Sequence, residues 1–200
     1  MHTLAKVSII VIIVAIFGVM LMMTNIKKKR WAAFAEKMNL NFSDGGILGL
    51  HTVDGTYKGY TVSLQRIHDT RPGSKRILTH MELHFPTPLT PRFRLSKEGV
   101  LQMLGKAAGG QDILVGDPDF DRRFVVKGSQ ENEIRALLND EAREALTALL
   151  GMSGTLVVSE VSIQMNLSGF VTDSDQLETI LNGYTHVAGI LERSSAALRV

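Results

Sequence analysis

The sequence contains no cysteine, and this absence removes several kinds of chemistry. Without thiols the chain forms no disulfide, builds no thiolate zinc site and carries no cysteine nucleophile. The absence does not identify the compartment, because many secreted proteins also lack cysteine. The lack of cysteine therefore excludes disulfides, thiolate zinc sites and thiol catalysis, and nothing more.

Acidic residues are absent from positions 1–30, although the whole chain of 200 residues has 20 of them. Five basic residues occupy that stretch, so the remaining positions hold 17 basic and 20 acidic residues and have a net charge of −3. A slightly acidic domain without a basic stripe is a poor match to nucleic-acid binding. We expect no nucleic-acid partner.

A long apolar run opens the chain. Every residue from 7 to 23 is apolar except Ser8, and with its flanks the run approaches the ~20 residues that cross ~30 Å of hydrocarbon. A cleaved signal peptide would end in small residues, whereas this run ends in Met-Leu-Met-Met. A helix buried inside the domain is disfavoured, because the run is apolar on all faces. The sequence therefore predicts a transmembrane helix over residues 1–26.

A basic cluster follows the apolar run directly and consists of Lys27, Lys28, Lys29 and Arg30. Basic flanks resist translocation, so we expect the N-terminus outside, the C-terminal domain in the cytoplasm and the lipid bilayer as a partner. Trp31, next to the cluster, has two interpretations. It is either an interfacial aromatic anchor or the first packing residue of the domain.

After the predicted span, we expect residues 27–42 to form the basic flank and a juxtamembrane amphipathic helix, and residues 43–200 to form one domain. The spacing of apolar residues in this part of the chain changes between the period of a strand and the period of a helix. Period-two alternation predicts strands at 48–53, 57–66, 77–85, 124–127, 155–159 and 161–167, with a hairpin turn at Asp54-Gly55. Helical spacing predicts helices at 30–39, 96–107, 131–150 and from about Asp173, the third of them interrupted at Asn139-Asp140. Strands and helices occur in blocks, which indicates an α+β fold of antiparallel strands with packed helices.

The densest group of acids is Asp117, Asp119 and Asp121. Alternating carboxylates in a loop could hold Ca²⁺ or Mg²⁺, but the calcium-loop pattern lacks its glycine and its final glutamate, where Gly128 stands. A turn whose aspartates cap backbone groups explains the same residues. These three aspartates are the only metal candidates, and we expect no other cofactor.

His80 and His84 share one face of a predicted strand. Their backbones are expected ~13 Å apart, too far for a single ion with bonds of ~2 Å. The sequence therefore favours outward, solvated histidines on both sides of Glu82 rather than a pair of metal ligands.

The block from Val115 to Gly128, which includes Asp117-Pro118-Asp119-Phe120-Asp121 and Phe124-Val125-Val126, resembles an uncharacterised family of bacterial membrane-anchored proteins with a D-x-x-F-D-x-x-F-x-V pattern. The entry from Trp31 to Phe42 and the strand from Gly55 to Val62 are similar as well. The chain departs from that family in having one predicted span rather than two. The resemblance implies a bacterial inner-membrane protein and supplies no activity.

These observations favour a single-pass, membrane-anchored cytoplasmic binding or scaffold domain with a protein partner of unknown identity. The chain has a well-patterned core and no convergent catalytic set, so a non-enzymatic role is favoured. Two alternatives stay open. One is a membrane-tethered, metal-dependent hydrolase using Asp117, Asp119 or Asp121 with a histidine, and the other is an anionic-lipid or envelope sensor using Trp31 and the basic cluster.

Overall fold

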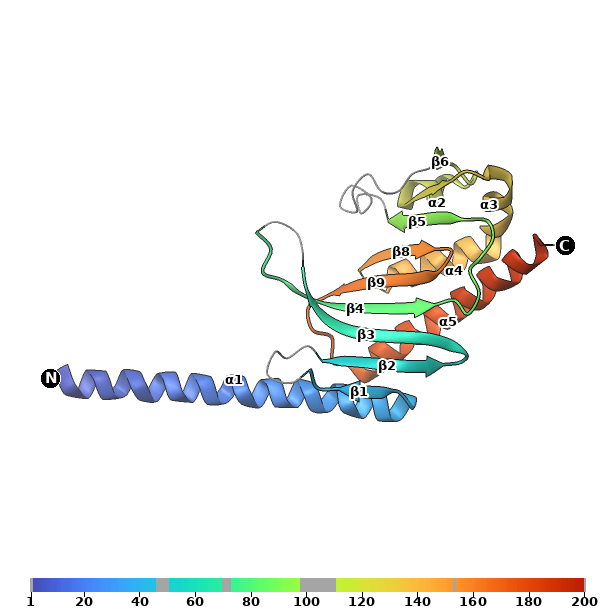
Figure 1. Ribbon diagram of the computed structural model, residues 1–200. Coiled ribbons are helices and arrows are strands. Elements are labelled where there is room, and N and C mark those ends of the chain that lie inside the picture. Colours follow the sequence, from blue (N-terminus) through green and yellow to red (C-terminus); the bar gives the residue numbers. More distant parts are fainter. Residues whose placement is uncertain (1, 46–50, 70–72, 98–110, 153, 200) are drawn as a thin grey trace.

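The computed structural model describes residues 2–45, 51–69, 73–97, 111–152 and 154–199. Within these residues, nine strands form one antiparallel sheet, and helices cover one of its faces (Figure 1). The predicted α+β class with antiparallel strands and packed helices is therefore correct for this part of the chain.

The elements follow the chain with strands and helices in blocks. The strands are β1 (Asn41–Ser43), β2 (Thr52–Tyr57), β3 (Tyr60–His68), β4 (Ile77–His84), β5 (Phe93–Lys97), β6 (Gln111–Ile113), β7 (Phe124–Gly128), β8 (Thr155–Ser159) and β9 (Ser162–Ser168). The helices are α1 (His2–Met38), α2 (Pro118–Arg123), α3 (Glu131–Leu137), α4 (Asp140–Gly151) and α5 (Ser174–Ala197). The order of strands across the sheet is β1-β2-β3-β4-β9-β8-β5-β7-β6.

Alternation along the central strands decides which face of the sheet is covered. Leu64 and Met81 are paired across β3 and β4, and both are buried, whereas their neighbours Gln65 and His80 are paired on the other face. Because side chains alternate between the faces of a strand, this register gives one apolar and one polar face. Tyr184 of α5 lies fully buried on the apolar face and donates a hydrogen bond to the carbonyl of Met81 at 3.1 Å.

Two helix starts lie where the sequence predicts them. The Asp173 carboxylate accepts hydrogen bonds from the N–H groups of Asp175 and Gln176 and begins α5. Asn139 divides the predicted helix 131–150 into α3 and α4, and its side chain accepts from the N–H of Ala142. Both residues satisfy backbone donors that a helix start would otherwise leave free.

The predicted hairpin turn at Asp54-Gly55 is wrong. These residues lie inside β2, and the turn between β2 and β3 is Lys58-Gly59, where both residues have positive φ (50° and 89°). The predicted helix 96–107 is also wrong at its start, because Ser96 and Lys97 belong to β5. Its remaining residues lie in 98–107, outside the described residues.

Most of the predicted membrane flank is bound to the domain. Lys28 pairs with the Asp44 carboxylate, the Lys27 ammonium lies 5.8 Å from the Phe170 ring centroid, and Arg30 donates to Thr172 at 3.3 Å. Trp31 is fully buried, packs edge-on against the Phe170 ring with 4.7 Å between ring centroids, and donates from Nε1 to the Val171 carbonyl at 2.7 Å. Of the two interpretations of Trp31, the structure therefore supports packing on the domain.

The predicted transmembrane helix is wrong by the structure. Among the described residues, no helix has both the length and the apolar character needed to cross a bilayer. Beyond Ile26, α1 continues without a break through the basic cluster and onto the domain. The predicted single-pass membrane anchorage and inner-membrane location, with the N-terminus out and the domain in the cytoplasm, are overturned with it.

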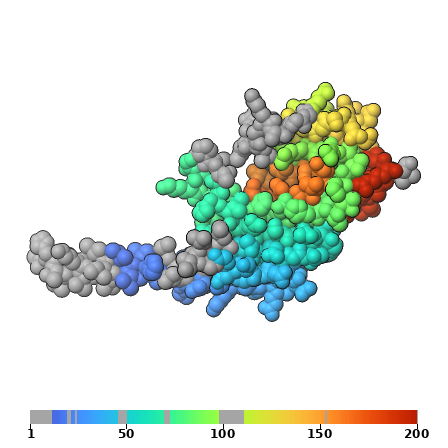
Figure 2. Space-filling view, in the orientation of Figure 1, coloured from blue at the N-terminus to red at the C-terminus, as the bar shows by residue number. Residues whose placement is uncertain are grey.

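The first part of α1 projects beyond the sheet (Figure 1), and in the space-filling view residues 12–19 stand clear of the rest of the surface (Figure 2). Nine large apolar side chains on this described part are 42–65% exposed: Ile12, Ile13, Val14, Ile16, Phe17, Val19, Met22, Met23 and Ile26. From Trp31 on the same helix is amphipathic, with Phe34, Ala35 and Met38 buried as their spacing predicts.

Candidate functional site

The acid-rich loop begins a short helix, α2. One carboxylate oxygen of its N-cap, Asp117, accepts hydrogen bonds from the N–H groups of Asp119 (3.0 Å) and Phe120 (3.1 Å). Pro118 suits the first helical position, where its missing N–H leaves no bond unmade. Phe120 is buried against Phe124, with 4.5 Å between ring centroids. The aspartate thus caps backbone groups, and the phenylalanine fixes the helix to the core.

The three aspartates of the predicted cation loop have separate partners. Asp117 caps α2, Asp119 pairs with Arg122 at 2.6 Å, and Asp121 turns the other way and accepts from the N–H groups of Val115 and Gly116 at 2.9 and 3.2 Å. In the part of the chain that the structure describes, no three side chains of His, Cys, Asp or Glu are arranged to hold a metal ion. The carboxylates of this loop are therefore engaged by backbone N–H groups and by Arg122.

Arg143 of α4 joins α2 to α4. Its guanidinium lies 3.3 Å from Asp117, pairs with Asp140 and donates to the Leu138 carbonyl at 2.7 Å. The side chain is only 18% exposed. A half-buried arginine with three acceptors is held in one geometry, because each bond uses a different N–H of the planar fork.

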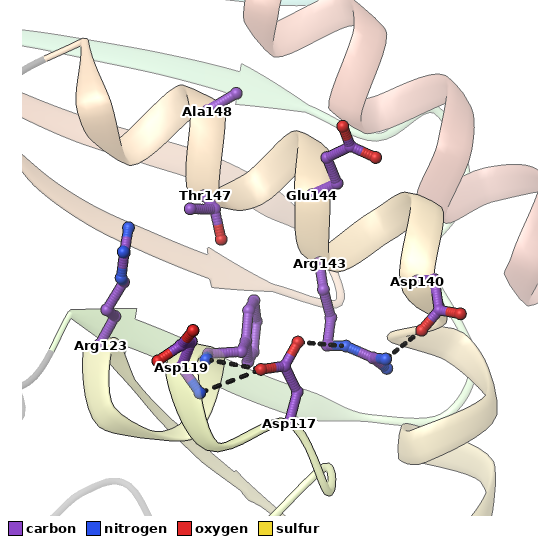
Figure 3. Close-up of a pocket in the computed structure, with 9 residues that line it drawn as sticks. Asp117, Asp119, Arg123, Asp140, Arg143, Glu144, Thr147 and Ala148 are labelled. Atoms are coloured by element: carbon purple, nitrogen blue, oxygen red, sulfur yellow. Dashed lines mark hydrogen bonds and ion pairs between the residues drawn. The ribbon is translucent and has the colours of Figure 1, made fainter.

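An open cleft of about 630 Å³ lies between α2 and α4 (Figure 3). Figure 3 shows the Asp117 carboxylate between the amides of α2 and the Arg143 guanidinium, with Arg123 further along the cleft. The lining is mostly charged and consists of Asp117, Asp119, Phe120, Arg123, Asp140, Arg143, Glu144, Thr147 and Ala148. Two of the three sequence candidates, Asp117 and Asp119, therefore lie in this cleft.

A second hollow lies on the other side of α4. This groove between α4 and α5 has a volume of about 330 Å³ and is lined by Glu141, Glu144, Ala145, Ala148, Leu149, Met152, Gly183 and His186. It shares Glu144 and Ala148 with the α2–α4 cleft. The two hollows are thus adjacent across the exposed side of α4, and we call their combined lining the α4 surface.

The pKa of Asp117 is lowered from the ordinary carboxyl value of 3.8. The main cause is the hydrogen bond from the Phe120 N–H, and the Asp119 N–H and the Arg143 guanidinium act in the same direction, while partial desolvation opposes them. A lowered pKa means that the carboxylate stabilises the fold above pH 3.8, and that this contribution is lost as the pH falls through the lower pKa of the folded state.

We expect Asp117→Asn to be less stable than the wild type near pH 6, and the difference to shrink as the pH falls below 3.8. Asparagine caps helices as well as aspartate does, so the variant removes the charge and keeps the cap. Urea unfolding between pH 3 and pH 7 measures the effect. Asp119→Asn is the matched control, since its exposed pair with Arg122 contributes little. A constant difference across the pH range would contradict the assignment.

The two histidines of β4 lie on the open face of the sheet and lean toward one carboxylate. Nε2 of His80 lies 3.9 Å and Nε2 of His84 3.5 Å from the same oxygen of Glu82. Gln164 donates to the other oxygen of Glu82 at 2.6 Å, and His80 contacts Asn166 at 2.7 Å. The outward placement agrees with the prediction, whereas the convergence on Glu82 depends on side-chain direction, which strand spacing does not define.

Sequence reasoning missed the α4 half of the site. Asp140, Arg143, Glu144 and Ala148 lie more than 20 positions after Asp117, and no local pattern connects them to it. The available signal was the break at Asn139-Asp140, which begins α4 at the cleft. Only the packing of α2 beside α4 shows that the two segments share one surface.

Comparisons with known proteins identify the fold and no family. No protein-family model matches the chain, and no curated protein matches it. A solved structure, the crystal structure of the mycobacterial trehalose monomycolate transport factor A, TtfA, matches with a TM-score of 0.57. The match covers 82% of this chain and 94% of that one at 10% sequence identity. At this identity the likeness shows a shared fold alone, and the resemblance of the Val115–Gly128 block to a bacterial family stays a prediction.

Proposed function

We propose that this chain is a non-enzymatic binding or scaffold protein and that a protein partner docks across the α4 surface. One observation carries the proposal: two hollows of about 630 and 330 Å³ meet at Glu144 and Ala148, on opposite sides of one exposed helix. The exposed side of α4 with a hollow on each side provides a broad surface, and protein–protein interfaces need an area of this kind with a complementary shape.

The chemistry of the α2–α4 cleft supports binding over catalysis. A general acid or base needs a group whose proton affinity matches its task, and a nucleophile needs an adjacent base. In this cleft Asp117 has a lowered pKa and is engaged by backbone amides and by Arg143. None of the described residues that line it is a histidine. The metal-dependent hydrolase therefore has no support from its proposed aspartates.

The contacts of the basic cluster make the sensor alternative the less favoured one. It requires free bases next to Trp31, whereas three of the four, Lys27, Lys28 and Arg30, contact Phe170, Asp44 and Thr172 of the domain. The fourth, Lys29, is exposed. Trp31 itself is fully buried.

Two further observations agree with a role that depends on other molecules. The described apolar side chains of α1 between Ile12 and Ile26 are exposed in the single chain, and an apolar surface of this extent is typical of a segment that contacts another molecule. The shared fold with a protein described as a transport factor is also consistent with a partner-dependent role.

Site-specific photocrosslinking tests the proposal. We expect a photoreactive phenylalanine analogue in place of Ala148, in the full chain within its native cells, to give a discrete protein adduct. Ala148 is exposed and lines both hollows, so the probe points to the partner without removing a core contact. The same analogue at Thr61, exposed on the open face of β3, is the matched control. No adduct at Ala148, or an equal adduct at Thr61, would contradict docking at the α4 surface.

A further inference from the structure

Carboxylates outnumber guanidinium groups on the α4 surface. Among the described residues, its two hollows are lined by five carboxylates and two guanidinium groups. Two further guanidinium groups, those of Arg122 and Arg193, pair with Asp119 and Glu141, so the excess over all of these groups is one negative charge. The five acids are Asp117, Asp119, Asp140, Glu141 and Glu144, and the two bases are Arg123 and Arg143. A surface with this imbalance attracts positively charged partners and repels negatively charged ones.

The carboxylates differ in how far they are already engaged. Asp117 and Asp140 pair with Arg143, Asp119 pairs with Arg122 at 2.6 Å, and Glu141 pairs with Arg193 at 2.9 Å. Glu144 is different: within the described part of the chain, no hydrogen bond or ion pair engages its carboxylate, although it lines both hollows. The acid with the most central position is therefore the one available to a ligand.

The α4–α5 groove adds an apolar component next to Glu144. Its lining includes Ala145, Ala148, Leu149 and Met152, and a glycine, Gly183, faces it from α5. A methyl group at Gly183 would lie 3.1 Å from the Leu149 side chain and 3.4 Å from that of Met152. The two helices approach closely because that position has no side chain, and the groove above them has room for a small or flexible apolar group.

We infer that the partner of the α4 surface presents a basic segment: a lysine or arginine side chain that pairs with Glu144, next to a small apolar side chain that enters the α4–α5 groove. The inference rests on the proposed function and adds the chemistry of the partner. Charge complementarity selects this occupant, because an acidic or purely apolar segment would leave Glu144 facing a like charge or without water.

Binding of a labelled peptide of alternating lysine and alanine to the full chain tests the inference by fluorescence anisotropy. We expect Glu144→Gln to weaken binding about threefold, the effect of one exposed ion pair. We expect Arg123→Gln to strengthen it, since that change removes a like charge from the cleft. Raising the salt concentration from 50 to 500 mM should reduce both differences, because salt screens exposed charges.

Two controls separate a site from general attraction. Asp54→Asn removes an exposed carboxylate from β2, away from α4, and should leave the affinity unchanged. A glutamate–alanine peptide should bind more weakly than the lysine–alanine peptide. Equal weakening by Asp54→Asn and Glu144→Gln, or equal binding of the two peptides, would overturn the inference.

The crosslinking and peptide experiments distinguish failure of the proposed docking surface from failure of the inferred basic partner. If the Ala148 adduct forms and neither Glu144→Gln nor excess lysine–alanine peptide reduces it, a protein docks at α4 but its contact is not basic. If no adduct forms at Ala148, the proposed function itself fails. An adduct that the peptide displaces, and that Glu144→Gln reduces, would support both.

Discussion

Replacing Trp31 with alanine is expected to lower the free energy of unfolding by about 3 to 5 kcal/mol, the range for removing a large buried aromatic side chain. Trp31 is fully buried where α1 meets the domain. The variant loses the edge-on contact with Phe170 and leaves the Val171 carbonyl without its 2.7 Å donor. Trp31 is the only tryptophan in the chain, so urea unfolding should be followed by circular dichroism rather than by fluorescence.

A matched substitution to alanine on the same helix controls for the gain in helix propensity and for the loss of apolar area. Ile26→Ala removes an apolar side chain that is 42% exposed, and its effect should stay within about 0.5 kcal/mol. Trp31→Phe keeps an aromatic ring and loses the hydrogen bond, which should have an intermediate effect. If Trp31→Ala were as mild as Ile26→Ala, the docking of α1 on the domain would be refuted.

Gly154→Ala should destabilise the fold by roughly 3 to 5 kcal/mol, combining an unfavourable backbone conformation with overpacking. Gly154 has a φ of +114°, which side-chain-bearing residues rarely adopt. A methyl group there would lie 2.4 Å from the carbonyl oxygen of Asn166 in β9. This neighbour is backbone in a central strand, so it cannot move without breaking the pairing of β8 with β9.

Gly169 separates the two causes. It also has a positive φ, +82°, but a methyl group at this position would contact nothing within 4 Å. Gly169→Ala therefore measures the backbone term alone and should destabilise by about 1 to 2 kcal/mol. The difference between the two variants in urea or thermal unfolding gives the contribution of the clash. Equal effects would mean that β8 and β9 are not as close as the structure has them.

Some elements were predictable because their signals are local. Asp173 and Asn139 begin helices in the structure, since a side chain that caps a helix bonds to N–H groups two or three residues further on. The buried face of β4, with Thr79, Met81 and Leu83, follows from alternation. These features need no information from distant parts of the chain.

Other predictions failed where a local signal competes with pairing. Asp54-Gly55 has the composition of a two-residue turn, but Gly55 pairs with Val62 within the sheet, and the strand continues to Tyr57. Ser96 resembled a helix start, yet it belongs to β5, which β7 and β8 pair on both sides. Pairing with neighbouring strands provides more hydrogen bonds than either local alternative would, and the sequence pattern alone does not show those neighbours.

Amino-acid order alone determined the α+β class, the buried faces of the main helices and strands, and the role of Asp117 as a cap, because each depends on residues only a few positions apart. Tertiary structure decided the path of α1 across its basic cluster, the burial of Trp31 against Phe170, and the meeting of two hollows at Glu144 and Ala148. These depend on which buried faces meet. The spacing of apolar residues shows which face of a helix or strand must be buried. Which other element packs against that face is decided by the tertiary structure.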